Sequence, residues 1–211
     1  MTAPRTITVD LLSDAAFARG EPTAGEVDVE VEHDKFGLPF LGGKTLHGLL
    51  RDTWLSMAHC FGDGLNGAAV RVLGAGGDLA ETAILRVGDA TVPDDVSAWV
   101  AQAVTRRVDP IRPADVLGAL TDVRYQTAEN RETGAPARAT LRATRVVLRD
   151  LRLHAPLRWL EEPTGQDLRC LALCALGTRH AGLSRNRGLG HVQLMLDGDV
   201  EATRSHAKEG A

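Results

Sequence analysis

The chain has 211 residues, enough for one sizeable hydrophobic core, and no apolar run approaches the roughly 20 residues that a membrane-spanning helix requires. Its three cysteines, with no secretory signal, argue against a disulfide framework and indicate a reducing cytoplasm. The net charge of −4 argues against a protein that is basic all over, but one basic face is possible: residues 10–34 contain eight acids and one arginine, whereas residues 106–158 contain eleven arginines and six acids.

The first part of the chain predicts two strands and a helix. Residues 5–12 are β-branched and apolar, which is typical of a strand. Residues 27–32 alternate strictly between valine and acid, which predicts a strand whose acidic face carries Asp28, Glu30 and Glu32. Apolar residues recur at the helical period over residues 44–61, and Thr45 is the predicted N-cap.

The remaining elements follow from composition and periodicity. In chain order they are a glycine-rich connection (62–81), a strand (82–92), a short helix (94–104), a long hairpin (123–159), an apolar helix ending near Gly182 (165–183), a last strand (191–196) and a frayed tail (201–211). This order predicts a single α+β domain over residues 1–211, with helices on one face of a ferredoxin-like sheet.

Two glycine-basic segments are candidate phosphate sites. In "NRGLGHVQLML", Gly188 and Gly190 permit positive φ and a close approach to a phosphate, while Arg185 and Arg187 supply charge; the alternative is a plain connection before a strand. "GGKTLHG" lacks the full phosphate-loop frame, because Leu38 stands where its first glycine belongs. A helix N-terminus there can still hold a phosphate, or serve only as a structural helix start.

Two other groups are ambiguous. The acidic face of residues 27–32 is either solvated, which the alternation favours, or holds Mg²⁺ for phosphodiester cleavage. Cys170 and Cys174 lie one helical turn apart without further ligands nearby, which favours buried apolar packing over a metal site.

Four segments together resemble the RAMP superfamily of CRISPR-associated proteins, in particular the backbone subunits of type III effector complexes that line the guide RNA. They are "GEVDVEVEHDKFGLP", "GLPFLGGKTLHGLLRD", "AENRETGAPARATLRATRVV" and "SRNRGLGHVQL", in the family's order. The chain departs from the family pattern at His47, where lysine is usual, at Gly42, where proline is common, and at residues 129–131, where the family has Ile-Asp-Arg.

The resemblance implies a ferredoxin-like, RNA-recognition-motif-like core with a protruding β-hairpin thumb at about residues 124–147, a glycine-rich loop at 184–190 and inserted loops. It places Asp28 on the aspartate that cleaves target RNA, where the carboxylate would hold a divalent cation. The implied RNA-binding residues are Lys44, Thr45, His47, Arg51, Asn130, Arg131, Arg185, Arg187, Gly188 and Gly190.

We therefore expect a cytoplasmic subunit of a type III CRISPR effector that binds guide RNA, meets complementary target RNA, and contacts other subunits and further copies of itself. Metal-dependent endoribonuclease activity through Asp28 and Mg²⁺ is one expectation. The segment "GGKTLHGLLRD" also resembles a larger RAMP subunit that need not cut RNA, so a non-catalytic scaffold is the alternative. A third hypothesis, from the residues alone, is an unrelated ferredoxin-like enzyme with a metal on its acidic strand.

Overall fold

The computed structural model describes residues 2–20, 27–75, 82–129, 131–135, 137 and 140–208. At its centre is an antiparallel sheet with the strand order β2–β5–β1–β6. Its strands are β1 (Thr6–Leu11), β2 (Leu85–Val87), β5 (Arg152–Trp159) and β6 (Val192–Leu196). The two central strands are thus β1 and β5, which lie far apart in sequence.

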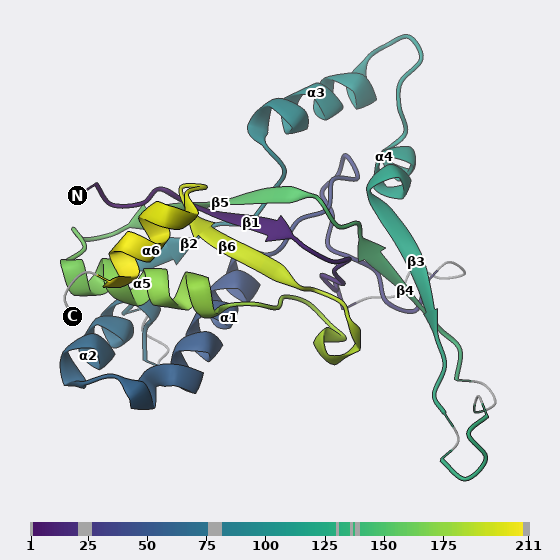
Figure 1. Cartoon of the computed structure of the whole chain (residues 1–211). Coiled ribbons are helices and arrows are strands. Elements are labelled where there is room, and N and C mark those ends of the chain that lie inside the picture. Colours follow the sequence, from purple (N-terminus) through teal and green to yellow (C-terminus); the bar gives the residue numbers. More distant parts are fainter. Residues whose placement is uncertain are drawn as a thin grey trace.

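Helices cover one face of this sheet, as Figure 1 shows. They are α1 (Gly43–Met57), α2 (Asp63–Leu73) and α5 (Gly165–Gly177), with α6 (Val200–Lys208) packed beside α5 and a 3₁₀ turn, η1 (Ala58–Cys60), between α1 and α2. The order β1–α1–β2–β5–α5–β6 with this strand arrangement is the ferredoxin-like topology. The predicted α+β fold class is therefore confirmed.

The core lies between the sheet and these helices because the sheet face and the helix faces that meet there each carry apolar residues at regular spacing. Alternation along β1 sends Ile7, Val9 and Leu11 to the helix side, where each is at most 1% exposed. Across from them, α1 contributes Leu46 and Leu50, four residues apart on one helix face and fully buried. Among the described residues, no helix is long and apolar enough to cross a membrane.

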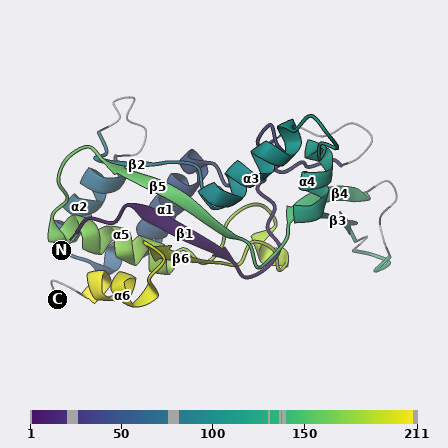
Figure 2. The same cartoon turned by 90° about the horizontal axis from the view of Figure 1, so that it is seen from above.

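A large insertion between β2 and β5 adds two helices and a pair of strands to this core. It contains α3 (Asp94–Thr105), α4 (Pro113–Leu120) and the antiparallel pair β3 (Thr121–Gln126) and β4 (Arg142–Val147). Figures 1 and 2 show that this pair projects from the end of the sheet opposite the two termini. The pair lies where the sequence predicts a thumb, and we use that name for β3, β4 and residues 127–141 between them.

Several predicted elements need correction. Residues 63–73 of the predicted connection (62–81) form helix α2, because Leu65, Ala68 and Val72 have the helical spacing that buries this helix against the core; residues 76–81 lie outside the described residues. The tail forms α6 up to Lys208, held by the buried Thr203. Helix α4 was not predicted. Helix α5 ends at Gly177 rather than near Gly182.

The predicted hairpin of residues 123–159 is too long. Asp150, at φ 68°, turns the chain after β4, and β5 then joins the central sheet instead of extending the thumb. Residues 27–32 are not a strand but a series of isolated bridges, such as Val29 with Thr144 and Val31 with Ala18. The alternation of valine and acid in residues 27–32 arises because successive side chains meet different neighbours at the base of the thumb.

Candidate nucleic-acid interface

The outer face of the sheet, which points away from the helices, offers no platform for stacking bases. Its described residues on the three longest strands are Thr6, Thr8, Asp10, Arg152, His154, Pro156, Arg158, Gln193 and Met195, with no Phe, Tyr or Trp among them. Two of them form a bidentate ion pair, Asp10 with Arg152 at 2.6 and 2.8 Å. RNA-recognition motifs bind through aromatic residues on this face. The described residues of this face therefore lack the aromatic side chains on which such motifs stack bases.

A groove of about 810 Å³ lies where the thumb meets the glycine-rich loop, and we call it the thumb-base groove. Its lining residues are Val29, Gln126, Thr127, Ala128, Thr140, Arg142, Thr144, Gly182, Leu183, Ser184, Arg185, Asn186 and Arg187. Three of these residues are arginines and none is acidic. The others include hydroxyl and amide side chains that can hydrogen-bond to sugars and phosphates.

The glycine-rich loop is shaped by left-handed backbone at its two ends. Ser184 precedes the short 3₁₀ turn η2 (Arg185–Arg187) at φ 56°, and Gly188 follows it at φ 80°. This turn exposes the two arginine side chains, and Arg187 donates a long hydrogen bond of 3.4 Å to Gln126 of β3. The loop and the thumb therefore form opposite walls of one groove.

The two predicted loop glycines have different roles. A Cβ on Gly188 would meet no atom within 4 Å, so its surroundings are open. Gly190 is buried, and a Cβ there would lie 2.0 Å from the Ala181 carbonyl oxygen. The Gly190 amide donates to the Asp14 carbonyl, and the Gly190 carbonyl accepts from the Ala181 amide. The close approach that needs glycine at position 190 is to the chain itself.

Asp28 lies at the root of the thumb and is exposed. Its Oδ2 accepts a hydrogen bond from the Ala143 amide at 2.7 Å, and its own amide donates to the Ala143 carbonyl at 2.9 Å. The residues that follow these two, Val29 and Thr144, line the thumb-base groove. The sequence-predicted aspartate is thus next to the groove, with one carboxylate oxygen already engaged by the backbone.

The described residues contain no group of three or more His, Cys, Asp or Glu side chains that could hold a metal ion. Asp28 contributes a single carboxylate. Mg²⁺ commonly keeps several waters and uses one or two carboxylates together with substrate phosphates. Asp28 could therefore take part in holding a cation whose coordination a nucleic-acid phosphate completes.

Two further carboxylates of the segment between β1 and α1 hold the thumb. Glu30 is only 3% exposed and pairs with Arg145 of β4 at 2.8 Å. This corrects the expected solvated acidic face, because Glu30 is buried and Glu32 accepts a hydrogen bond from the Gly42 amide at 3.2 Å. Asp14 accepts from Arg124 of β3 at 2.6 Å and from the Arg149 amide at 3.1 Å.

The pKa of the Asp14 carboxyl reflects these contacts. Partial burial raises it, but the hydrogen bonds from Arg124 and from the Arg149 amide, together with both positive charges, have the larger combined effect. The pKa therefore lies below its ordinary value, and Asp14 is ionised at neutral pH.

The start of α1 is separate from the thumb-base groove. Gly42, not Thr45, is the N-cap. The Gly43 amide donates to Asp89 at 2.7 Å, and the Gly42 amide to Glu32, so two of the amides expected to meet a phosphate already bind carboxylates. Lys44 and Thr45 are exposed, whereas His47 and Arg51 are half-buried. Lys44 and His47 line a second cavity that shares no residue with the groove.

The thumb itself presents polar and apolar side chains to solvent. Arg131 is exposed in the turn beyond β3, and Asn130 lies outside the described residues. Tyr125 and Leu141 are 66% and 63% exposed. The sequence did not single out Gln126 and Arg142, which line the groove. They face a loop that lies far from them in sequence, which leaves no local signal.

No protein-family model and no curated protein matches the sequence. Solved structures do share its fold. A chain of "Type III-B Cmr-beta bound to cognate target RNA" aligns at TM-score 0.68 and 11% identity, covering 96% of this chain and 99% of the other. A chain of the apo state of Type III-B Cmr-beta aligns at TM-score 0.66 and 11% identity, covering 93% and 98%. The chain therefore shares the fold of these type III-B Cmr-beta chains over almost its whole length.

Proposed function

We propose that this protein is an RNA-binding subunit of a type III CRISPR effector complex, and that it holds the phosphates of a guide RNA in the thumb-base groove. The observation that carries the proposal is the groove itself: Arg142, Arg185 and Arg187 meet there from the thumb and the loop, and none of the lining residues that the structure describes is acidic. Its place on a fold shared almost end to end with Cmr-beta complex chains supports the same conclusion.

The charge balance of the chain is consistent with this assignment. Three acidic side chains near the thumb are used inside the protein: Asp14 with Arg124, Asp28 with the Ala143 amide and Glu30 with Arg145. The groove arginines are then not opposed by an acidic side chain among the described lining residues. Arginine–phosphate contacts fix position without reading sequence, which is the task of a subunit on which base pairing supplies specificity.

The test is to purify the protein together with the other products of its operon and ask whether short RNA of uniform length accompanies it. Arg142→Gln with Arg187→Gln should reduce the retained RNA, and Arg106→Gln, an exposed arginine at the end of α3 outside the groove, is the matched control. Equal RNA retention by the groove variant and the control over a salt series would contradict the proposal.

A second part of the proposal concerns target cleavage. Asp28 is exposed beside the groove, where it can meet an RNA phosphate, and this favours the catalytic assignment over a remote surface acid. In the reaction that the family resemblance implies, the ribose 2′-oxygen attacks the adjacent phosphorus and loses its proton. The 5′-oxygen leaves and gains one, and a 2′,3′-cyclic phosphate remains. A divalent cation would stabilise the charge on the phosphate. The alternative is a non-catalytic scaffold in which Asp28 only holds the thumb.

A further inference from the structure

Asp14, in the segment between β1 and α1, contacts the elements that form both walls of the thumb-base groove. Its carbonyl accepts a hydrogen bond from the Gly190 amide, at the end of the glycine-rich loop, at 2.7 Å. Its carboxylate accepts from the Arg124 side chain of β3 at 2.6 Å and from the Arg149 amide, just after β4, at 3.1 Å. One residue therefore joins the loop to both strands of the thumb.

The backbone next to Asp14 holds the loop and one edge of the thumb. Ala15 pairs with Val147 at the end of β4 through hydrogen bonds of 2.9 and 2.8 Å, and the Leu183 amide donates to the Ala16 carbonyl at 2.9 Å. Figure 1 shows the chain running from the end of β1 to this junction at the base of the thumb. Because β4 pairs with β3 along its other edge, β3 lies beyond β4 as seen from Ala15.

The Asp14 side chain adds a contact on this farther strand. A two-stranded ribbon that is held along one edge can pivot about that edge, and the ion pair with Arg124 gives the thumb a second point of attachment. Side chains alternate along a strand, so Arg124 and Gln126 share one face of β3. Gln126 lines the groove and accepts the hydrogen bond from Arg187 of the loop. Movement of Arg124 would therefore move a wall of the groove.

Neither partner of this ion pair lines the groove. Asp14 and Arg124 line a separate cavity of about 580 Å³, which reaches the loop at Gly188 and Leu189 and shares no lining residue with the groove. The Asp14 side chain is 14% exposed and that of Arg124 is 50% exposed. A pair in this place acts on RNA in the groove through the position of the walls.

We propose that Asp14 is a positioning residue that holds the two walls of the thumb-base groove at the spacing that a bound RNA needs. This inference rests on the proposed RNA-binding function. The Asp14 carbonyl holds the loop and its carboxylate holds β3, so that Arg142 and Arg185 stay on facing walls. Loss of the carboxylate charge frees β3 and lets the groove widen, while every arginine of the groove remains.

The experiment measures RNA affinity over a salt series, with the protein purified together with the other products of its operon. Asp14→Asn and Arg124→Gln should each lower the affinity roughly two- to tenfold, the range expected for a charged contact with one half-exposed partner. The double variant should bind as tightly as either single variant, because both substitutions break the same ion pair.

Asp10→Asn is the matched control. It breaks the ion pair of Asp10 with Arg152 on the outer face of the sheet, where the two bonds are 2.6 and 2.8 Å long. The side chains of that pair are 22% and 57% exposed, close to the values for Asp14 and Arg124. Asp10→Asn should leave RNA affinity unchanged, whereas a general loss of stability would affect both variants.

Two further readouts separate positioning from direct contact. The slope of log affinity against log salt should keep its wild-type value in Asp14→Asn and Arg124→Gln, whereas removal of an arginine that touches a phosphate lowers it by about 0.7. The Arg145 amide donates to the Val29 carbonyl at 2.9 Å at the base of the thumb. Its hydrogen exchange should become faster in Asp14→Asn and not in Asp10→Asn.

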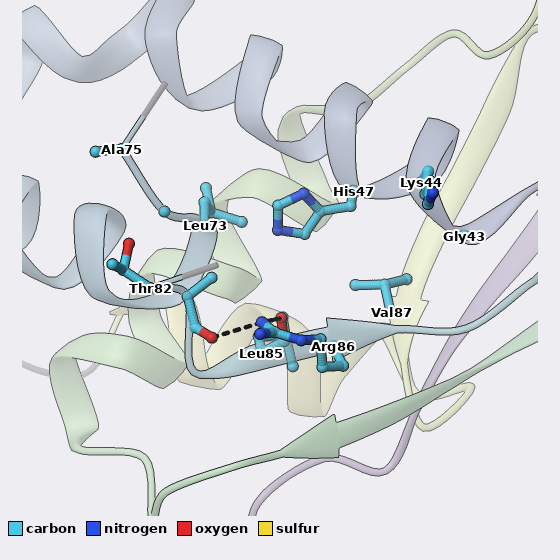
Figure 3. A pocket seen from close by; sticks show the side chains of 11 residues that line it. Gly43, Lys44, His47, Leu73, Ala75, Thr82, Leu85, Arg86 and Val87 are labelled. Carbon is cyan, nitrogen blue, oxygen red and sulfur yellow. Dashed lines mark hydrogen bonds between the residues drawn. The ribbon is translucent and has the colours of Figure 1, made fainter. Parts of the chain in front are cut away.

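The cavity at the start of α1, shown in Figure 3, is not affected by these substitutions. Lys44 and His47 lie there, and none of its described lining residues belongs to the thumb or to the glycine-rich loop. RNA held at that cavity would therefore stay bound in the Asp14 variant, so a loss of RNA reports on the groove.

Equal RNA affinity of Asp14→Asn and Asp10→Asn, or a lowered salt slope in Arg124→Gln, would overturn the proposal. The groove variant Arg142→Gln with Arg187→Gln distinguishes this failure from failure of the proposed function. If the groove variant loses RNA and Asp14→Asn does not, only the positioning role is wrong. If the groove variant also keeps its RNA, the RNA lies elsewhere and both proposals are wrong.

Discussion

Asp28 and Ala143 are joined by two reciprocal hydrogen bonds: the Ala143 amide donates to the Asp28 carboxylate at 2.7 Å, and the Asp28 amide donates to the Ala143 carbonyl at 2.9 Å. The same carboxylate is the proposed catalytic group. Asp28 therefore has a positioning role that a mutation to alanine removes together with its charge, and a second substitution is needed to separate the two.

Asp28→Asn keeps an oxygen that can accept from the Ala143 amide but loses the negative charge that a cation needs. If Asp28 is catalytic, Asp28→Asn and Asp28→Ala should both abolish metal-dependent cleavage in the assembled complex, while target binding stays close to wild type. Chelation with EDTA should have the same effect on the wild-type complex. Cleavage is followed on labelled target RNA.

The opposite pattern identifies the scaffold alternative. Should Asp28→Asn cut as fast as wild type, or should wild type not cut at all in Mg²⁺, the carboxylate only holds the thumb. In that case Asp28→Ala should still loosen the thumb, which hydrogen exchange of the Ala143 amide would record.

The thumb-base groove predicts a specific salt dependence. Removing one arginine–phosphate interaction lowers the slope of log affinity against log salt by about 0.7 for a single strand. Arg187→Gln should therefore reduce the slope by roughly that amount in RNA binding by the assembled subunit, and Arg142→Gln should do the same. Arg106→Gln should leave the slope unchanged. Unaltered slopes in both groove variants would place the RNA elsewhere.

The buried ion pair between Glu30 and Arg145 predicts a large loss of stability. The Glu30 side chain is 4% exposed and that of Arg145 is 13% exposed, so the carboxylate and the guanidinium meet with little water around them. Glu30→Ala should lower the free energy of unfolding by about 3–5 kcal/mol, the usual cost of breaking a buried pair. Chemical denaturation measures this. Glu201→Ala, which breaks an exposed pair with Arg204, should leave the midpoint unchanged.

The contacts of Asp14 predict a loss of stability in acid. Its folded-state pKa lies below the ordinary value of 3.8, so its contribution is complete above that value and disappears as the pH falls through the folded pKa. The difference in unfolding free energy between wild type and Asp14→Asn should therefore be largest near neutral pH and shrink below about pH 4. A constant difference from neutral pH into strong acid would show that Asp14 acts without its charge.

The elements that could be predicted from the sequence are those in which one regularly spaced set of apolar side chains packs against a single core. β1 and α1 each bury a single regular face, such as Ile7 and Val9 or Leu46 and Leu50, and this regular burial is visible as an apolar pattern. Residues 27–32 alternate as well, but Glu30 is buried against Arg145 from a distant part of the chain, and periodicity carries no information about such a partner. Spacing alone likewise could not reveal the groove, because its walls meet only in the folded chain.

Gly188 and Gly190 provide the last test, because a glycine can be needed for its left-handed φ alone or also because a Cβ has no room. The sequence could not distinguish these two reasons, and the structure does. Gly190 has φ 72° and no room for a Cβ, which would lie 2.0 Å from the Ala181 carbonyl oxygen. Gly190→Ala should therefore destabilise the protein by more than the roughly 1–2 kcal/mol of left-handed strain alone, and release RNA only because it unfolds. Gly188 has φ 80° but open surroundings, so Gly188→Ala should add only that strain and any clash with bound RNA. Thermal unfolding and RNA retention are measured on both variants. Reduced RNA retention by folded Gly190→Ala protein would contradict the structural explanation and return position 190 to the RNA interface.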